Sequence, residues 1–307
     1  MRKAAILAVL GGLVGWIVAG ALLAEPPARA QTPSPMQLGH AGQASFLPGF
    51  DGKRPIFVLA IGSDARPGVC EPVEKCLADS IHLIGVNPRK QGASILGLPR
   101  DSYVDVPGVG TRKINDSLYE GGPELVVETV EELVGVDIDY YLLTSFHGLR
   151  RMVNGVGGIE VEIPYAMNDA ASGAVFSPGP QMLDGKQALA FARNRKDTPN
   201  GDFSRSENQG SLILGALERL RKDVRRDPLS LFTWLTSGLR NIQTELSAGE
   251  VFDLALAALT IEPNRVVNRV TPGGIGFAGE ASVVQLGSEA DAVFADIADD
   301  GLLEPSA

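Results

Sequence analysis

A continuous apolar run at residues 56–61, within "RPIFVLAIGSD", constrains the fold of this 307-residue chain more than any other segment. The run has no polar face, so a strand formed here is predicted to be buried on both faces. Two more segments with strand character follow at 80–87 and 93–101. The link between these two is short enough for an antiparallel turn, which predicts neighbouring antiparallel strands.

Helical patterns alternate with the strands. Residues 123–136 carry apolar side chains at helical spacing, with Pro123 at the start and Gly135 at the end. Further helices are predicted at 147–158, 184–195 and 204–224, and further strands at 139–146 and 159–164. Strands interleaved with helices predict a layered α/β domain with a mixed sheet.

The N-terminal region is predicted to be a targeting segment. Two basic residues precede an apolar stretch at 4–24, which is long enough to span a bilayer, so we predict that 1–24 is a transmembrane anchor. A cleaved signal segment is the alternative, because residues 28–30 read Ala-Arg-Ala. Both alternatives place the rest of the chain outside the cytoplasm. Residues 25–53, rich in Pro, Ala, Gly and Gln, are predicted to be a flexible linker before a domain at 54–302.

The overall charge argues against one class of partner. The formal net charge is −10, whereas proteins that coat nucleic acid present a broad basic face, so we predict no nucleic-acid partner. Cys70 and Cys76 enclose a short polar loop, and in an oxidising compartment we predict a disulfide between them. Metal binding is the alternative, but no second Cys or His pair accompanies them.

Charged residues follow the ends of the predicted strands. If the first three strands are antiparallel neighbours, Asp64, Asp79, Arg100 and Asp101 converge on one edge of the sheet, beneath the loop with the two cysteines. Two aspartates at such an edge suit a hard cation, Mg²⁺ or Mn²⁺. The alternative is that the aspartates cap turns, and the pattern alone leaves both possibilities open.

A second charged stretch, "RNRKDTPNGDFSRSENQ" at 193–209, contains arginines in an otherwise acidic chain. Helical phase places Arg205 and Gln209 on the apolar stripe of the helix that follows, so both are predicted to point inward. An inward arginine needs a partner. That partner is either an acidic residue, Asp202 or Glu207, or a phosphate group bound at the helix N-terminus.

Several blocks of the chain together resemble one family. They are "VLAIGSDAR", "ADSIHLIGVNPRKQGASILGLPRDSYVDVPG", "KINDSLYEGGPELVVETVEELVGVDIDYY", "GVGGIEVEIP", "LDGKQALAFARNR" and "GDFSRSENQ", in that order. This succession is similar to the LytR–CpsA–Psr family of cell-wall glycopolymer ligases. The resemblance implies a three-layer α/β/α sandwich with a mixed central β-sheet and a hydrophobic pocket. It also implies a single N-terminal membrane anchor and transfer of a glycopolymer from a polyprenyl-pyrophosphate carrier to peptidoglycan, which leaves a phosphodiester link.

The resemblance also implies roles for individual residues. Asp64 and Asp79 would bind the divalent metal, Mg²⁺ or Mn²⁺. The pyrophosphate and the rest of the substrate would be held by Arg66, Arg100, Lys113, Arg193, Arg195, Arg205 and Gln209. Phosphoryl transfer depends on positioning and charge neutralisation, which arginines and a metal supply. Asp202, amid the arginines, is the candidate base for the acceptor hydroxyl.

Three positions depart from the family pattern. Leu77 stands where an arginine is common, Asn208 where many members have another, and Ser145 where an acidic or amide residue is frequent. A catalytically weak or inactive binder of polyprenyl phosphates is therefore an alternative function, and a phosphatase acting on pyrophosphate lipids is another. Transcriptional regulation is disfavoured, because the chain is acidic and has no recognisable helix-turn-helix.

Overall fold

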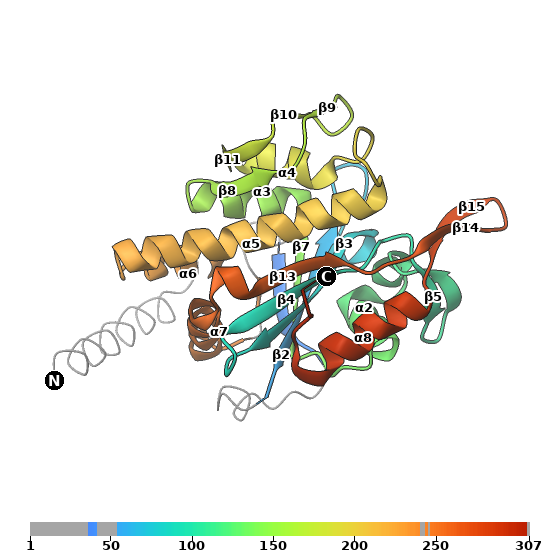
Figure 1. The fold of residues 1–307 in the computed structure, drawn as a ribbon, viewed down its shortest axis with the longest axis horizontal. Coiled ribbons are helices and arrows are strands. Elements are labelled where there is room, and N and C mark those ends of the chain that lie inside the picture. The colour runs from blue at the N-terminus through green and yellow to red at the C-terminus, as the bar shows by residue number, and fades with distance from the viewer. Residues whose placement is uncertain (1–35, 42–53, 240–242, 245, 306–307) are drawn as a thin grey trace. The chain divides into compact units, whose positions relative to one another are not determined.

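The structure, a computed structural model, describes residues 36–41, 54–239, 243–244 and 246–305 (Figure 1). In these residues a seven-stranded sheet has the order β12-β1-β7-β2-β3-β4-β13. The strands are β1 (Met36–His40), β2 (Ile56–Ser63), β3 (Ala78–Asn87), β4 (Gly92–Gly97), β7 (Tyr140–Ser145), β12 (Gln243–Thr244) and β13 (Val266–Val270). The sheet is mixed, as predicted: β2, β3 and β4 are antiparallel neighbours, whereas β7 runs parallel to β2 and β13 parallel to β4.

Helices cover both faces of this sheet, which confirms the layered α/β architecture. On β2, Phe57, Leu59 and Ile61 belong to a core with α2 (Asp116–Val134) and α8 (Ser288–Asp300). Ile56 and Val58, which point the other way, pack with residues of the opposite layer. That layer contains α3 (Phe146–Gly155), α4 (Gly185–Arg193), α5 (Asp202–Arg226), α6 (Ser230–Leu239) and α7 (Ala248–Thr260). The run at 56–61 is therefore a strand covered on both faces.

Two predicted boundaries differ from the structure. Strand β1, Met36–His40, lies inside the region predicted to be a linker, and it pairs with β7. The composition of this segment gives little strand signal. Its strand conformation depends on pairing with the distant β7 rather than on local preference. Helix α2 begins at Asp116 rather than at 123, because a first turn precedes a kink at Gly122 (φ 77°, ψ −170°). Pro123 follows the kink and begins the predicted helical pattern.

In the part of the chain that the structure describes, four two-stranded sheets and two short 3₁₀ helices surround the main sheet. The pairs are β5 (Tyr103–Val106) with β6 (Gly110–Lys113), β8 (Ile159–Ile163) with β11 (Gly179–Leu183), β9 (Met167–Asp169) with β10 (Ala174–Phe176), and β14 (Gly274–Ala278) with β15 (Ala281–Gln285). The 3₁₀ helices are η2 (Val73–Lys75) and η3 (Pro263–Arg265). The β14–β15 hairpin projects from the domain (Figure 1).

The predicted anchor at 1–24 lies outside the described residues. Among the residues that are described, no helix has the length and apolar character needed to cross a membrane.

Candidate functional site

Charged side chains converge where β3 begins, β4 has just ended and α5 begins. Arg100 Nη1 lies 2.6 Å from Asp79 Oδ1, and Arg205 Nη1 lies 3.5 Å from the same oxygen. Arg205 also forms an ion pair with Asp202, one turn earlier on α5. Asp101 extends the cluster, because its Oδ1 lies 3.0 Å from Lys113 Nζ. We call these six residues the ion cluster.

The N-terminal turns of α5 supply two buried members of the site. Arg205 and Gln209 are 4% and 9% exposed, which confirms that both point inward. Gln209 Nε2 donates to the carbonyl oxygens of Ala192, at 3.1 Å, and Asp79, at 3.4 Å. The acidic partner Asp202 is present, and Arg205 is therefore held in the ion cluster before any phosphate binds. The structure thus shows the first of the two partners that the sequence left open.

Burial acts against several of these charges. It lowers the pKa of Arg205 although Asp79 and Asp202 oppose the shift, and the positive charges of Arg100 and Arg195 add to the lowering. Burial also raises the pKa of Asp202, against the effect of Arg205. Arg205 therefore lies where water solvates it poorly and where other positive charges are near. The attraction between Arg205 and a bound anion would therefore be stronger than at an exposed position, because less water screens the two charges.

Arg100 behaves differently. Burial opposes its charge, but Asp79, Asp101 and Asp202 together outweigh burial and raise its pKa. Arg100 is therefore fixed as a cation at the end of β4, with Asp79 as its closest ionic partner.

Two more predicted arginines lie over one aromatic ring, which was not among the predicted site residues. The guanidinium of Arg193 lies 4.8 Å from the ring centroid of Phe146, and that of Arg66 lies 5.7 Å from it. Both distances permit a cation–π interaction. Phe146 directly follows β7, and an aromatic residue at a strand end is the signal that could have indicated it. Arg195 is exposed, and its positive charge is near enough to contribute to the lowered pKa of Arg205.

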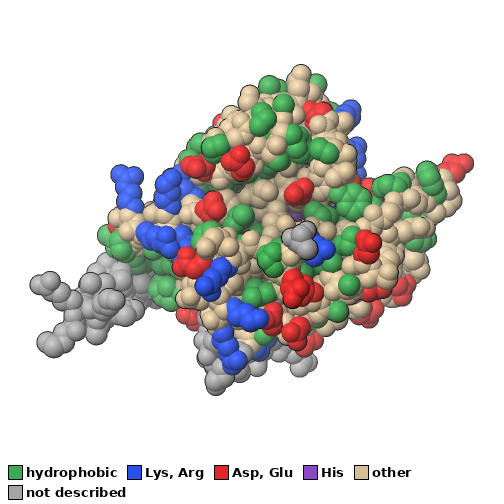
Figure 2. Space-filling view, in the orientation of Figure 1, with side chains coloured by type: hydrophobic (Ala, Val, Ile, Leu, Met, Phe, Trp, Pro, Cys, Tyr) green, Lys and Arg blue, Asp and Glu red, His purple; other side chains and the backbone are tan. Residues whose placement is uncertain are grey.

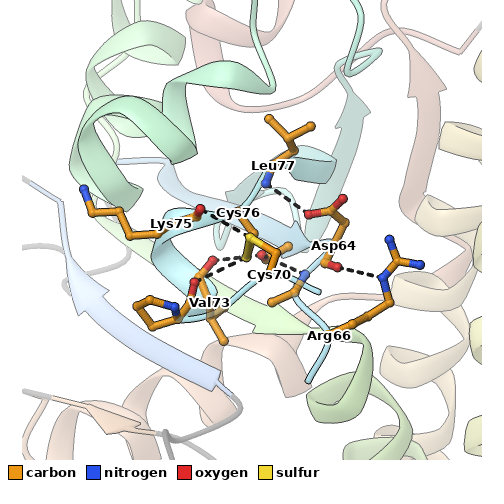
Figure 3. Close-up of a disulfide and its surroundings, with 10 residues drawn as sticks. Asp64, Arg66, Cys70, Val73, Lys75, Cys76 and Leu77 are labelled. Atoms are coloured by element: carbon orange, nitrogen blue, oxygen red, sulfur yellow. Dashed lines mark hydrogen bonds between the residues drawn. A yellow bond between two sulfur atoms is a disulfide. The ribbon is translucent and has the colours of Figure 1, made fainter. Parts of the chain in front are cut away.

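Asp64 follows β2 and is held by the neighbouring loop (Figure 3). Its Oδ1 accepts the backbone N–H of Leu77 at 3.1 Å, and its own N–H donates to the Leu77 carbonyl at 3.0 Å. A disulfide joins Cys70 to Cys76, as predicted, and closes this loop. Leu77 stands where the resemblance leads one to expect an arginine. Its backbone N–H and carbonyl hold Asp64 in place through the two hydrogen bonds given above.

Asp64 and Asp79 offer carboxylate oxygens to a cation. In the described part of the chain, no group of three or more His, Cys, Asp or Glu side chains is arranged to hold a metal. Mg²⁺ is commonly bound by one or two carboxylates together with waters and substrate phosphates, so two aspartates at an anion site suit it. Asp79 already contacts Arg100 and Arg205, and a cation there would compete with these arginines.

An apolar cavity of about 300 Å³ begins at the ion cluster. Its floor is formed by β2, β3 and β7, and its walls by α3, α4, α5 and α6. The apolar lining includes Ala60, Ile84, Leu142, Leu149, Met152, Val153, Leu212, Ile213, Ala216 and Trp234. A volume of this size is within the range of small-molecule pockets.

The polar residues of the lining lie at one end of the cavity. Register pairs Gly62 with Ser80 and Ser63 with Ser145, so these residues share the edge of the sheet where Asp79 lies. Arg193 and Gln209 line the same end. The cavity is therefore charged at its mouth.

The other end of the cavity is apolar. On α5, Ile213 and Ala216 follow Gln209 toward the C-terminus, about one and two helical turns deeper. Trp234 of α6 lines the cavity as well, and its Nε1 donates to Asp223 farther along α5. The cavity thus has the amphipathic form that suits a lipid whose headgroup is an anion.

A buried histidine links the cavity mouth to α5. His82 is fully buried, with Nε2 3.0 Å from the Ser206 carbonyl oxygen and Nδ1 3.1 Å from Ser80 Oγ. Because a carbonyl only accepts, Nε2 carries the hydrogen and Nδ1 accepts the hydroxyl of Ser80. Burial lowers the pKa of His82 to about 4, although the Ser206 carbonyl opposes this shift.

We expect His82 to make the folded state acid-sensitive. In the unfolded chain its pKa is about 6.5, so the unfolded chain binds a proton between pH 6.5 and 4 that the folded chain does not. Stability is therefore complete above about pH 6.5 and falls as the pH drops toward 4, by roughly 2 kcal/mol between pH 7.5 and 5. Urea unfolding of the protein and of His82→Gln at both pH values measures this. An identical pH dependence in the variant would contradict the expectation.

The remaining two departures from the family pattern lie at buried positions. Ser145 caps α3, because its Oγ accepts the N–H of Gly148 at 3.2 Å. Asn208, on α5, is buried, with 2% of its surface exposed.

A family model and curated relatives match this chain. The LytR_cpsA_psr family model matches residues 29–293. The polyisoprenyl-teichoic acid–peptidoglycan teichoic acid transferase TagU of Enterococcus faecalis is 35% identical over 206 residues, which is 66% of this chain and 66% of that protein. TagU of Bacillus subtilis is 36% identical over 54% of this chain and 53% of the relative. The chain therefore matches 66% of the length of the Enterococcus relative and about half, 53%, of the Bacillus subtilis relative.

Solved structures show the same fold. A Streptococcus agalactiae protein has a TM-score of 0.70 at 24% identity and covers 83% of this chain and 91% of its own. TagT bound to LIIa-WTA has a TM-score of 0.66 at 24% identity, with coverage of 81% and 91%. TagT with bound octaprenyl pyrophosphate lipid has a TM-score of 0.62 at 21% identity, with the same coverage. The extent of the family match, together with this fold, shows that the chain belongs to the LytR_cpsA_psr family.

Proposed function

We propose that this protein transfers a glycopolymer from a polyprenyl-pyrophosphate carrier to peptidoglycan and leaves a phosphodiester link. The observation that carries the proposal is an apolar cavity whose mouth is lined by Arg193 and Gln209 beside the ion cluster. A polyprenyl chain suits the cavity, and a pyrophosphate suits the arginines. The names of the TagU relatives describe the same type of transfer.

The arginines would do most of the catalytic work. Arg100, Arg205 and Lys113 would contact phosphate oxygens from the ion cluster, and Arg193 would contact them from above Phe146. Charge develops on several oxygens during phosphoryl transfer, and groups already in position stabilise it without reorganisation. Arg195 and Arg66, at the exposed rim, would add positive charge for binding the substrate.

Asp202 would accept the proton of the attacking hydroxyl. Burial raises the pKa of its carboxyl group, which makes the group a stronger base than an exposed aspartate. In Asp202→Asn we expect kcat to fall about 100-fold while donor binding is retained. Turnover equal to that of the unchanged protein would remove this role from Asp202.

Asp64 and Asp79 would hold Mg²⁺ or Mn²⁺ with oxygens of the pyrophosphate. When bound, the cation supplies positive charge to the transferring phosphoryl group. We expect Asp64→Ala to lose metal-stimulated transfer and to bind Mn²⁺ at least tenfold more weakly by electron paramagnetic resonance in the presence of pyrophosphate. Unchanged Mn²⁺ affinity would exclude Asp64 as a ligand.

Product analysis separates the proposed transfer from its alternatives. The full chain is incubated with a defined polyprenyl-pyrophosphate oligosaccharide, with and without peptidoglycan. A phosphodiester-linked product that requires peptidoglycan supports the ligase. Release of phosphate in both reactions would indicate a phosphatase, and binding without turnover would indicate an inactive lipid-binding protein.

The site is proposed to work outside the cytoplasm, beside the membrane. The disulfide is typical of an oxidising compartment, and a polyprenyl carrier is itself a membrane lipid. Residues 1–24 would then be the membrane anchor. Protease treatment of intact cells is expected to degrade the domain, and full protection in cells with an accessible surface would contradict this placement.

A further inference from the structure

A second depression, of about 1,030 Å³, lies beside the N-terminal end of α5 and has no role in the function proposed above. We call it the hairpin groove. One wall is formed by Asn200 and Phe203, and the other by 272–275 at the base of the β14–β15 hairpin and by 285–289 before α8. In Figure 1 the yellow N-terminal end of α5 and the red hairpin lie on the same side of the domain.

Both walls of the hairpin groove are connected to the ion cluster. On the α5 wall, Asp202 lies in sequence between Asn200 and Phe203. On the hairpin wall, the backbone N–H of Val284 donates to the carbonyl of Asp101 at 2.8 Å. Asp101 and Asp202 are also close enough for the charge of one to affect the pKa of the other. These connections place the hairpin groove next to the ion cluster.

The hairpin groove, the ion cluster and the lipid cavity follow one another along the chain at the start of α5. This order indicates which substrate the groove binds. Residues 200–203 line the hairpin groove, Asp202 and Arg205 belong to the ion cluster, and residues from Gln209 to Ala216 line the lipid cavity. In phosphoryl transfer the attacking and leaving oxygens are roughly in line. If the polyprenyl phosphate leaves toward the cavity, the attacking hydroxyl arrives from the groove.

We propose that the hairpin groove binds the glycan chain of the peptidoglycan acceptor. This proposal rests on the function proposed above, and it gives the binding site of the second substrate, the peptidoglycan acceptor. The acceptor hydroxyl oxygen forms a bond to the phosphorus that carries the glycopolymer. The bond from that phosphorus to the bridging oxygen breaks, polyprenyl phosphate leaves with the electron pair, and Asp202 takes the hydroxyl proton.

The lining of the groove fits a sugar polymer. Phe203 and Ile275 offer apolar surface to sugar rings, and Gln285, Ser288 and Glu289 offer hydrogen-bonding groups around it. Phe277 is two residues from Ile275 on β14 and shares its face; the two side chains are 70% and 67% exposed. Figure 2 shows hydrophobic side chains along the projecting hairpin. This face lengthens the groove, as a polymeric ligand requires.

The glycan of the donor is the competing occupant. It is attached to the same phosphorus, but through an oxygen that neither attacks nor leaves. The candidate base Asp202 lies beside the groove, and a base must contact the acceptor hydroxyl. This position favours the acceptor.

Two glycines allow the groove to be blocked without disturbing the fold. A Cβ atom added at Gly274 or Gly287 would meet nothing within 4 Å, and neither residue has a positive φ. Gly274→Trp and Gly287→Trp therefore place a large side chain at the groove. Gly249→Trp on α7 is the matched control, since its added Cβ would meet only Ser247 Oγ at 3.7 Å.

The experiment uses the full chain in detergent micelles and an uncross-linked peptidoglycan oligomer as the probe. We expect both groove variants to bind the oligomer at least tenfold more weakly in the absence of donor. They should keep the donor KM and the melting temperature, and the control should bind normally. Unchanged oligomer affinity in both groove variants would overturn the proposal, and so would a raised donor KM with normal oligomer affinity.

These results are separable from the proposed function. Product formation by the unchanged protein together with normal oligomer binding by both variants would reject the groove alone. Absence of transfer together with groove-dependent oligomer binding would reject the ligase reaction and retain the groove as a glycan site.

Discussion

Replacement of Arg205 by lysine is expected to lower kcat about 100-fold, because one positioned donor to a developing oxyanion commonly contributes a factor of this size. Arg205 is 4% exposed and lies between Asp79 and Asp202. Lysine keeps the positive charge but lacks the planar fork that can contact a carboxylate and a phosphate together. Steady-state transfer with a defined lipid-linked donor measures the loss.

A matched arginine on the same helix provides the control. Arg219 forms an ion pair with Asp223 at 2.9 Å and is not part of the ion cluster or the cavity lining. Arg219→Lys should keep both kcat and KM. If Arg205→Lys turns over as fast as Arg219→Lys, the role of Arg205 in charge stabilisation is wrong.

Filling the apolar end of the cavity is expected to affect long carriers selectively. Ala216 lines the cavity about two turns beyond Gln209, and a phenylalanine there would occupy space that the polyprenyl chain needs. Burial of each CH₂ contributes about 0.8 kcal/mol, so exclusion of two such groups costs roughly tenfold in affinity. Ala216→Phe should therefore raise the KM for a full-length polyprenyl donor by at least tenfold.

A carrier shorter than the distance from Gln209 to Ala216 supplies the internal control. Ala216 lies about 10 Å beyond Gln209 along α5, so a donor on a single five-carbon prenyl unit ends before Ala216, and Ala216→Phe should leave its KM unchanged. Ala216→Ser, which adds little volume, should resemble the unchanged protein with both donors. An equal effect on both carriers would mean that the variant disturbs the ion cluster, and the assignment of the cavity to the lipid would fail.

Much of the fold follows from local patterns in the sequence. The run at 56–61 predicts a strand covered on both faces, and the short link after 80–87 predicts the antiparallel pair β3–β4. Helical phase alone places Arg205 and Gln209 in the interior. These predictions succeed because each depends on neighbours within one element. Strand β1 escapes prediction because its pairing with β7 involves residues about 100 positions away.

The site is less predictable than the fold. Strand ends and helical phase bring Asp79, Arg100 and Arg205 together, but nothing in their spacing indicates Phe146 as the platform for Arg193. The cavity is lined by side chains from three strands and four helices. Whether such side chains leave a space depends on how all seven elements pack, and no single segment of the sequence shows this. The hairpin groove likewise needs the C-terminal hairpin to lie beside α5.

The fate of the phosphate attached to the glycopolymer tests the central claim most directly. A lipid-linked donor is labelled at that phosphorus and incubated with the full chain, a divalent cation and peptidoglycan. The proposed mechanism predicts that the label enters peptidoglycan as a phosphodiester, with release of one unlabelled polyprenyl phosphate for each link. Label recovered as free phosphate, or retained on the polyprenyl chain after the glycan has been transferred, would contradict it.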